Sequence, residues 1–344
     1  MFQQLLTICR NTFLESIRQP IFVVLLIAFG LLLVLNPAMA ANTLDDDNKL
    51  MIAMGLSTLF LAGLFLAAFT ATGVLASEID NKTVLTVVSK PVSRPVFVLG
   101  KFAGVAAALA VAFWILGGLF LLTVRHRVMQ TASDPFDLPV IVFGTLAWFG
   151  ALAFASWANY FQRRVFTSTF VLSLAAATTV ALLLVLMINK HWEFQPITTE
   201  FDPGSDSAMP HGQLPIVMLL LYEAILMLTA VAIAASTRLG QIMTLVICSG
   251  VFLLGLVSEI LLAPAVHRIT WADVTGAPSF FAWALPHLLY WVVPNFQFLW
   301  LAEALQRGVL IPPAHILMVS AYAILEIIAV LALAIALFQE REVS

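Results

Sequence analysis

Long apolar runs without charge alternate with short polar segments along the whole chain. Residues 50–77 and 102–124, for example, contain no charged side chain. An uncharged apolar run of about 18 residues or more is typical of a membrane-spanning helix. On this pattern eight spans are predicted, at residues 21–35, 50–77, 96–124, 139–161, 165–188, 214–236, 239–262 and 314–338.

The segment that precedes the first span has a pattern of its own. Residues 1–19 have the periodicity of an amphipathic helix that lies in the membrane interface. We expect Asn36-Pro37 to break the first span near its outer end. A leader cleaved after Ala40 is disfavoured, because the part before the apolar run is long and amphipathic and contains Glu15.

Two longer segments interrupt the spans in the second half of the chain. Residues 189–213 are rich in Asp, Gly and Pro, which predicts an external loop without internal structure. Residues 264–313 are rich in aromatic side chains, and Pro278, Pro286 and Pro294 are expected to divide them into short helices. Such a segment belongs at the membrane interface or in re-entrant elements packed within protein.

Some features suggest how the spans pair. The fourth and fifth predicted spans resemble the sixth and seventh, since each pair joins two apolar helices through a brief basic link. This similarity suggests a six-span core enlarged by one helical hairpin. At the start of the third span, Gly100 and Gly104 form a small-xxx-small pair that is compatible with close helix packing.

The composition agrees with a membrane protein and excludes several other classes. The chain is 62% hydrophobic and 10% charged, with a mean hydropathy of +1.02, whereas about a quarter of the residues are charged in soluble domains. We therefore predict an all-α polytopic integral membrane protein, in which residues 1–344 form a single transmembrane domain. Cys9 and Cys248 predict neither a disulfide framework nor a metal site.

No residue pattern predicts chemistry on a nucleotide, a metal or a nucleic acid within this chain. Gly100-Lys101 lacks the upstream glycine of a phosphate-binding loop, and Phe102 stands where Ser or Thr is needed. No nucleophile-and-base arrangement or basic cluster stands out either. We therefore expect no catalytic residue, cofactor or metal here, and if ATP drives the protein, another chain must bind it.

The distribution of basic residues predicts an orientation. Eight spans put both termini on one side, and that side carries ten of the 16 Lys and Arg residues, against six on the other. An excess of Lys and Arg marks the cytosolic side, so both termini are predicted to be cytosolic. The ten are Arg10, Arg18, Lys82, Lys90, Arg94, Lys101, Arg163, Arg164, Arg238 and Arg341. The six are Lys49, Arg125, Arg127, Lys190, Arg268 and Arg307.

Residues 77–101, SEIDNKTVLTVVSKPVSRPVFVLGK, form a short polar segment with internal order. Apolar and β-branched residues follow Glu78 and Asp80, and Lys90-Pro91 then ends the element. One short surface helix closed by prolines fits this pattern.

This segment resembles the loop after the second span in permease subunits of type-2 ABC exporters. The run SKPVSR at residues 89–94 matches closely, as does Gly100-Lys101, while Glu78 matches an acidic position of the family. Lys82 departs from the family, because it replaces a glycine that usually precedes the threonine matched by Thr83.

The resemblance implies that this loop carries a coupling helix, which docks on a separate cytosolic subunit that hydrolyses ATP. Alternatively, it is an ordinary cytosolic loop whose basic residues merely fix the topology. The residues that the resemblance assigns to the contact with the ATPase subunit are Glu78, Asp80, Lys82, Thr83, Ser89, Lys90, Arg94 and Lys101.

The same resemblance implies further properties of the whole protein. Residues 1–19 would be the elbow helix with which these permeases begin, and residues 264–313 would hold a re-entrant outer gate rather than an interfacial aromatic belt. The protein would lie in the plasma (inner) membrane as a dimer with a second permease subunit, identical or merely similar. Its interior of few charges would suit export of an amphiphilic substrate.

Acidic residues within the spans favour other interpretations. Glu223 and Glu326 lie well inside apolar runs, and Glu259 lies nearer an outer end. An ionisable group at membrane depth is a candidate for function, although a structural acid bonded to a neighbouring polar side chain is the favoured interpretation. Alternatives to the exporter are an ion-coupled secondary transporter that uses Glu223 and Glu326, or a non-transporting structural component. An intramembrane enzyme would need a polar catalytic cluster, and only isolated acids are present.

Overall fold

A computed structural model describes residues 2–41, 47–80, 93–129, 136–195, 211–268 and 271–339. Within these ranges the chain is helical, apart from turns and one isolated bridge between Ile188 and Phe194. The helices are α1 (Phe2–Arg18), α2 (Pro20–Ala40), α3 (Asp47–Asp80), α5 (Arg94–His126), α6 (Leu138–Gln162), α7 (Phe166–Met187), η1 (His211–Gln213), α8 (Leu214–Ser236), α9 (Gln241–Leu261), α10 (Ala263–Arg268), η2 (Trp271–Asp273), α11 (Ala277–Val292), α12 (Ala302–Gln306) and α13 (Pro313–Gln339).

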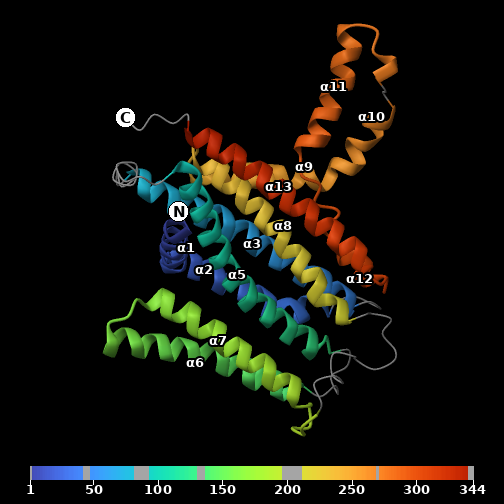
Figure 1. Cartoon of the computed structure of the whole chain (residues 1–344). Helices are drawn as coiled ribbons and strands as arrows, with labels where there is room; N and C mark the ends of the chain where they lie inside the picture. Colours follow the sequence, from blue (N-terminus) through green and yellow to red (C-terminus); the bar gives the residue numbers. More distant parts are fainter. Residues whose placement is uncertain are drawn as a thin grey trace.

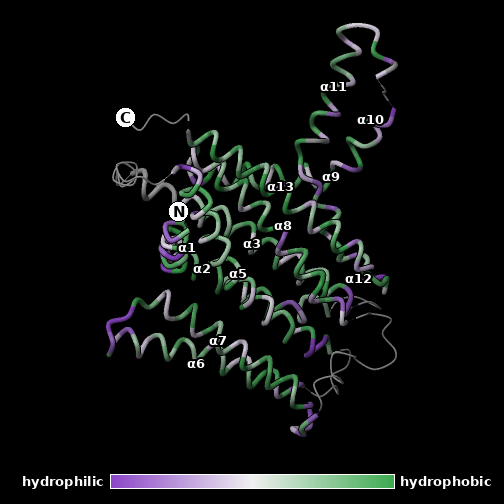
Figure 2. Tube along the Cα trace, in the orientation of Figure 1, coloured by the Kyte–Doolittle hydropathy of each residue, from purple (hydrophilic) through white to green (hydrophobic). Residues whose placement is uncertain are grey.

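The predicted class and the predicted spans are confirmed. Eight helices in the described part of the chain are long and apolar enough to cross a membrane, namely α2, α3, α5, α6, α7, α8, α9 with α10, and α13. The boundaries of α8 coincide with those predicted from the sequence. Figure 2 shows the hydrophobic stretches along these helices, with hydrophilic residues concentrated toward their ends. The chain is an all-α, multi-pass membrane protein.

Three local expectations were wrong. Helix α2 continues through Asn36-Pro37 to Ala40, because the missing N–H of proline removes one bond only, and the Asn36 side chain donates to the Met51 carbonyl at 2.8 Å. Helix α5 runs on to His126, beyond the predicted end of its span. Pro286 lies inside α11 and does not end a helix there.

The predicted loop at residues 189–213 also begins with more order than expected. The Ile188–Phe194 bridge closes a turn, inside which two backbone N–H groups donate to the side chain of Asn189 at 2.9 and 3.0 Å. Residues 196–210 of this segment lie outside the described part of the chain.

Both termini lie at the same end of the helix bundle (Figure 1). We call it the terminal end, and the opposite one the far end. At the terminal end the Phe97 ring of α5 stacks on the Phe338 ring of α13, with centroids 5.4 Å apart. Arg238, in the link between α8 and α9, donates to the Leu337 carbonyl of α13 at 3.0 Å. The segment between α3 and α5 is also flanked by described residues at this end.

The core of the bundle is formed by α3, α5 and α8, whose apolar residues are buried for the most part. Helices α6 and α7 form a hairpin on one flank, and α9 and α13 lie on the other (Figure 1). The flanking position of α6 and α7 agrees with an added hairpin, while an internal duplication stays a prediction. Helices α10 and α11, from the aromatic-rich segment, extend away from the other helices. Whether that segment acts as a gate or as an interfacial belt also stays a prediction.

Candidate functional site

The amino-terminal helix α1 packs closely across the beginning of α5. In Figure 1 α1 is seen nearly end-on, whereas the spans run obliquely across the view. A Cβ atom added at Gly100 would lie 2.7 Å from Ile8 Cγ2, and one at Gly104 would lie 2.6 Å from the Cys9 carbonyl oxygen. Only glycine permits such an approach of two helices. The small-xxx-small pair therefore does mediate close packing, and its partner is α1.

An ion pair joins the same two helices. Lys101 of α5 places its Nζ atom 3.6 Å from Glu15 Oε2 of α1, and the side chains are 3% and 36% exposed. The ammonium group also lies 5.6 Å from the centre of the Phe97 ring. A buried ammonium group needs such partners, because its desolvation is otherwise very unfavourable. Lys101 is thus placed to hold α1 on α5, and its predicted contact with an ATPase subunit stays a prediction.

Helix α3 meets the same junction. A Cβ atom added at Gly73 would lie 2.8 Å from Nε2 of Gln19, the residue between α1 and α2. From Asp47 to Asp80, α3 is about 51 Å long, well above the ~30 Å of a bilayer's hydrocarbon core. The helix therefore tilts or projects, as its long apolar run predicted. We call the contact among α1, the end of α3 and the beginning of α5 the elbow joint.

The residues predicted to contact an ATPase subunit lie in or beside this joint as far as the structure describes them. Glu78 and Asp80 belong to the last turns of α3, and Arg94 is the first residue of α5. Lys101 lies beneath α1. The others, Lys82, Thr83, Ser89 and Lys90, lie outside the described residues together with the short helix expected there.

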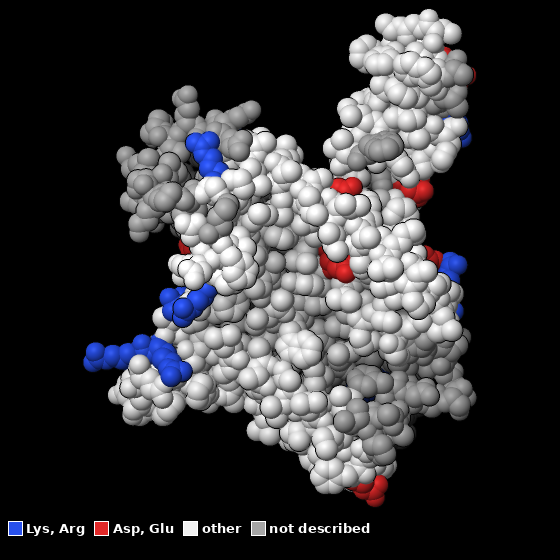
Figure 3. Space-filling model, in the orientation of Figure 1, with Lys and Arg blue, Asp and Glu red and all other residues white. Residues whose placement is uncertain are grey.

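Charged side chains mark the terminal end on the molecular surface. In Figure 3 basic side chains gather along the edge at which the termini lie, while the broad surface over the spans is uncharged except for a few acidic groups. The described basic residues near this end are Arg10, Arg18, Arg94, Lys101, Arg163, Arg164 and Arg238. The orientation of the termini and the identity of the facing compartment both stay predictions.

The intramembrane acids have polar neighbours. Ser320 of α13 donates to Glu223 Oε1 of α8 at 2.9 Å. The other carboxyl oxygen of Glu223 is buried without a hydrogen-bond partner among the described residues. Glu326 lies one turn away from Tyr322 on the same helix. The structure reports no bond between Glu223 and Glu326 in the part of the chain that it describes.

A polar network near the far end was not anticipated from the sequence. Glu259 of α9 accepts hydrogen bonds from Tyr290 at 3.2 Å and from the Asn295 side chain at 3.0 Å. The Asn295 backbone N–H donates to the hydroxyl oxygen of Tyr322 at 2.7 Å, and Glu326 lies one turn further along α13. The polar residues within the aromatic segment were the available signal. The network gives Glu259 two hydrogen-bond donors and ties α9 and the end of α11 to α13.

Comparisons with known proteins identify no family. A scan against protein-family models finds no match, and a search of curated proteins finds no relative. The resemblance of residues 77–101 to the coupling loop of type-2 ABC exporters therefore stays a prediction that rests on the residues themselves.

Proposed function

We propose that this chain is the membrane-spanning permease subunit of an ATP-driven exporter of the type-2 ABC class. A separate cytosolic subunit binds and hydrolyses ATP, and the segment between α3 and α5 contacts it. Two permease chains and two ATPase subunits form the transporter in the plasma (inner) membrane, with the termini in the cytosol. The exported substrate is an amphiphile that fits an interior of few charges.

The elbow joint is the observation that carries this proposal. The polar segment with the family's motif leaves α3 and enters α5. Near its ends α5 packs against α1, and α3 contacts Gln19, the residue that follows α1. A partner that displaces this segment would therefore move three helices together, because backbones in such close contact cannot slide independently. This is the mechanical requirement for coupling ATP binding to a change in the spans.

The contact is tested by purifying the tagged chain from its native membrane in mild detergent. We expect an ATP-binding subunit to co-purify with the wild type, and Glu78→Lys to reduce its recovery by about tenfold, because like charges would face each other across the contact. Glu193→Lys is the matched control, since it makes the same change on an exposed residue at the far end. Equal recovery of the ATPase subunit with both variants would show that Glu78 is not part of the contact.

Complete absence of an ATPase from an intact preparation would contradict the exporter assignment. The remaining candidate is then an ion-coupled secondary transporter, favoured by the buried carboxyl oxygen of Glu223 that has no hydrogen-bond partner among the described residues. In that case Glu223→Gln and Glu326→Gln abolish ion-dependent uptake into vesicles, whereas charge reversal at Glu78 leaves it intact. A structural membrane component would show neither activity.

A further inference from the structure

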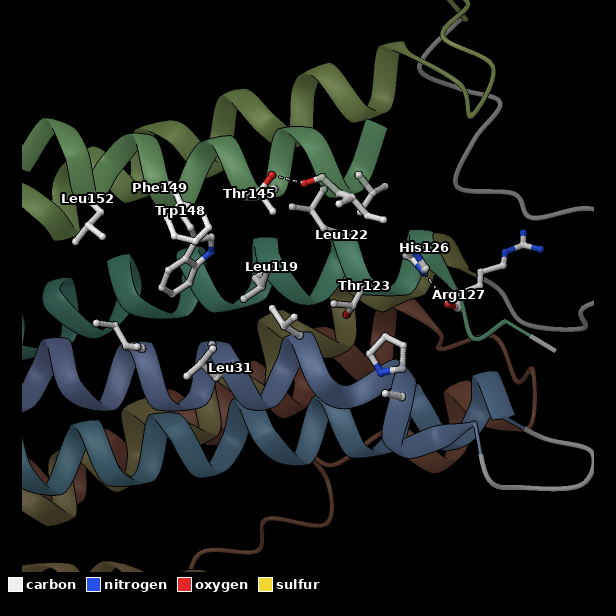
Figure 4. A pocket seen from close by; sticks show the side chains of 18 of the residues that line it. Leu31, Leu119, Leu122, Thr123, His126, Arg127, Thr145, Trp148, Phe149 and Leu152 are labelled. Atoms are coloured by element: carbon white, nitrogen blue, oxygen red, sulfur yellow. Dashed lines mark hydrogen bonds between the residues drawn. The ribbon is translucent and has the colours of Figure 1, made fainter. Parts of the chain in front are cut away.

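A long apolar groove separates the α6–α7 hairpin from α2. It encloses a cavity of about 620 Å³ between residues 27–41 in and just after α2, residues 119–127 in and just after α5, and residues 140–152 of α6 (Figure 4). Its walls are formed almost wholly by aliphatic and aromatic side chains. On the α2 side, Leu31 and Val34 are 58% and 54% exposed, so no described part of this chain covers them.

The groove exists because α6 packs along α7 and not along α2. Trp148 of α6 reaches across the gap, where its ring would lie 2.7 Å from a Cβ atom at Gly30. It also packs edge-on against Phe170 of α7 with ring centroids 6.3 Å apart. Toward the far end α6 contributes no side chain to the groove at Gly144, so the groove is wider there. A Cβ atom at Gly144 would meet only Leu122, at 3.8 Å. The gap is too large for the neighbouring side chains to fill.

The groove has the depth of one membrane leaflet. The α6 wall at residues 140–152 is about 18 Å long, and half of a bilayer's hydrocarbon core is about 15 Å thick. The groove starts where α2 and α5 end at the far end of the bundle and runs inward from there. An acyl chain of a lipid from the leaflet at that end would therefore lie along it.

Two cationic or protonatable side chains stand at the mouth of the groove. His126 is the last residue of α5, beyond Leu122 and Thr123. Arg127 follows it, and its side chain extends past the helix (Figure 4). Arg127 has a φ angle of 62°, a conformation that residues other than glycine rarely adopt and that is concentrated at functional positions. A guanidinium group in this place suits a phosphate at the level of the lipid headgroups.

We propose that the groove binds a phospholipid, with one acyl chain between α2 and α6 and the anionic phosphate beside His126 and Arg127. The apolar walls recognise the chain, and the cationic mouth favours an anionic headgroup over a zwitterionic one. The lipid fills the space between the hairpin and the rest of the bundle. This proposal goes beyond the exporter function and does not rest on it.

The acyl-chain part is tested by photolabelling. The full-length chain is reconstituted in phosphatidylcholine vesicles that contain phosphatidylglycerol with a diazirine in one acyl chain, and labelled peptides are mapped by mass spectrometry. We expect labels on the groove walls of α2 and α6 in the wild type, and loss of most of them in Gly144→Phe, whose ring occupies the groove.

Gly150→Phe is the matched control for this variant. Gly150 lies on the same helix outside the groove, and a Cβ atom there would have no atom within 4 Å. We expect its labelling to equal that of the wild type, with the same tryptic fragments in all three proteins showing that each is folded. Equal labelling of α2 and α6 in both variants would mean contact with bulk lipid only and would overturn the proposal.

The headgroup part is tested by comparing diazirine-bearing phosphatidylglycerol with phosphatidylcholine that carries the same photoreactive chain. We expect Arg127→Gln to lower the preference for the anionic lipid by about fivefold, the usual contribution of one basic residue at a membrane surface. Lys190→Gln, an exposed change of the same kind at the far end, leaves the preference unchanged. The same preference in Arg127→Gln as in the wild type would remove the headgroup contact from the proposal.

Discussion

Helix α5 carries an ion pair near each of its ends, and the surroundings of the two pairs differ. Near the terminal end Lys101 pairs with Glu15 of α1 at 3.6 Å, and the two helices touch through glycines. Near the far end Arg125 pairs with Asp137 at 3.2 Å, with side chains that are 8% and 6% exposed. Beside this second pair α2 and α6 lie apart and leave the apolar groove between them.

The difference shows two ways of attaching a peripheral element to the bundle. At the elbow joint, close backbone contact over a whole helix face lets α1 and α5 move only together. At the far end polar contacts add to apolar packing in attaching the α6–α7 hairpin. Arg125 also donates to the carbonyl of Val185 and, at 2.6 Å, to that of Ile188, while Leu122 of α5 packs against Val140 and Val185. The first arrangement transmits displacement, and the second leaves room for a ligand between the elements.

The largest effect is expected from removing the far-end attachment. Arg125→Met leaves the buried carboxylate of Asp137 without its cation and two carbonyls without a donor, so we expect the free energy of unfolding to fall by about 3 kcal/mol. An SDS titration of the purified protein in mixed micelles measures this.

Lys190→Met is the control for that variant. It removes the same charge from an exposed side chain at the same end, and its effect should stay within about 0.5 kcal/mol. If the two variants lose equal stability, the hairpin is not attached through Arg125.

Overpacking the elbow joint is expected to have the next largest effect. In Gly104→Leu the new side chain meets Thr12 Cβ at 2.5 Å and the Cys9 carbonyl oxygen at 2.6 Å, and the backbone contact cannot yield without moving α1. We expect a loss of about 2 kcal/mol and faster tryptic cleavage after the exposed Arg10. Gly150→Leu, where a Cβ atom meets nothing within 4 Å, should change neither measurement. Unchanged protection of α1 in Gly104→Leu would show that the close contact does not hold it.

Much of the fold could be predicted from the sequence because spans are a property of local composition. An apolar run longer than the hydrocarbon core folds into a helix wherever it lies in the chain, since its backbone groups must bond within the segment. Helix α8, bounded by polar residues on both sides, was predicted to the residue. Pro37 was misjudged because its effect depends on a tertiary bond, that from Asn36 to Met51.

The site could be predicted only in part, because its contacts join segments far apart in the chain. Gly100 and Gly104 predicted close packing with another helix, but they did not predict that this helix is α1. Lys101 was predicted from the family resemblance to contact an ATPase subunit, and its burial against Glu15 could be seen only in the fold. The groove had no signal at all, since the cavity arises where α2 and α6 lie apart while both contact α5.

The smallest effect is expected in the coupling energies of the two ion pairs. We expect a double-mutant cycle of Lys101→Met and Glu15→Gln to give a coupling energy of about 1 kcal/mol, because water still reaches the carboxylate of Glu15, which is 36% exposed. The same cycle with Arg125→Met and Asp137→Asn should give roughly twice as much, since neither partner is solvated. Each cycle needs the unfolding free energies of four proteins in the same micelles. Equal coupling energies would mean that solvent exposure does not weaken the Lys101–Glu15 pair. The ion pair would then stabilise the elbow joint as much as its glycines do.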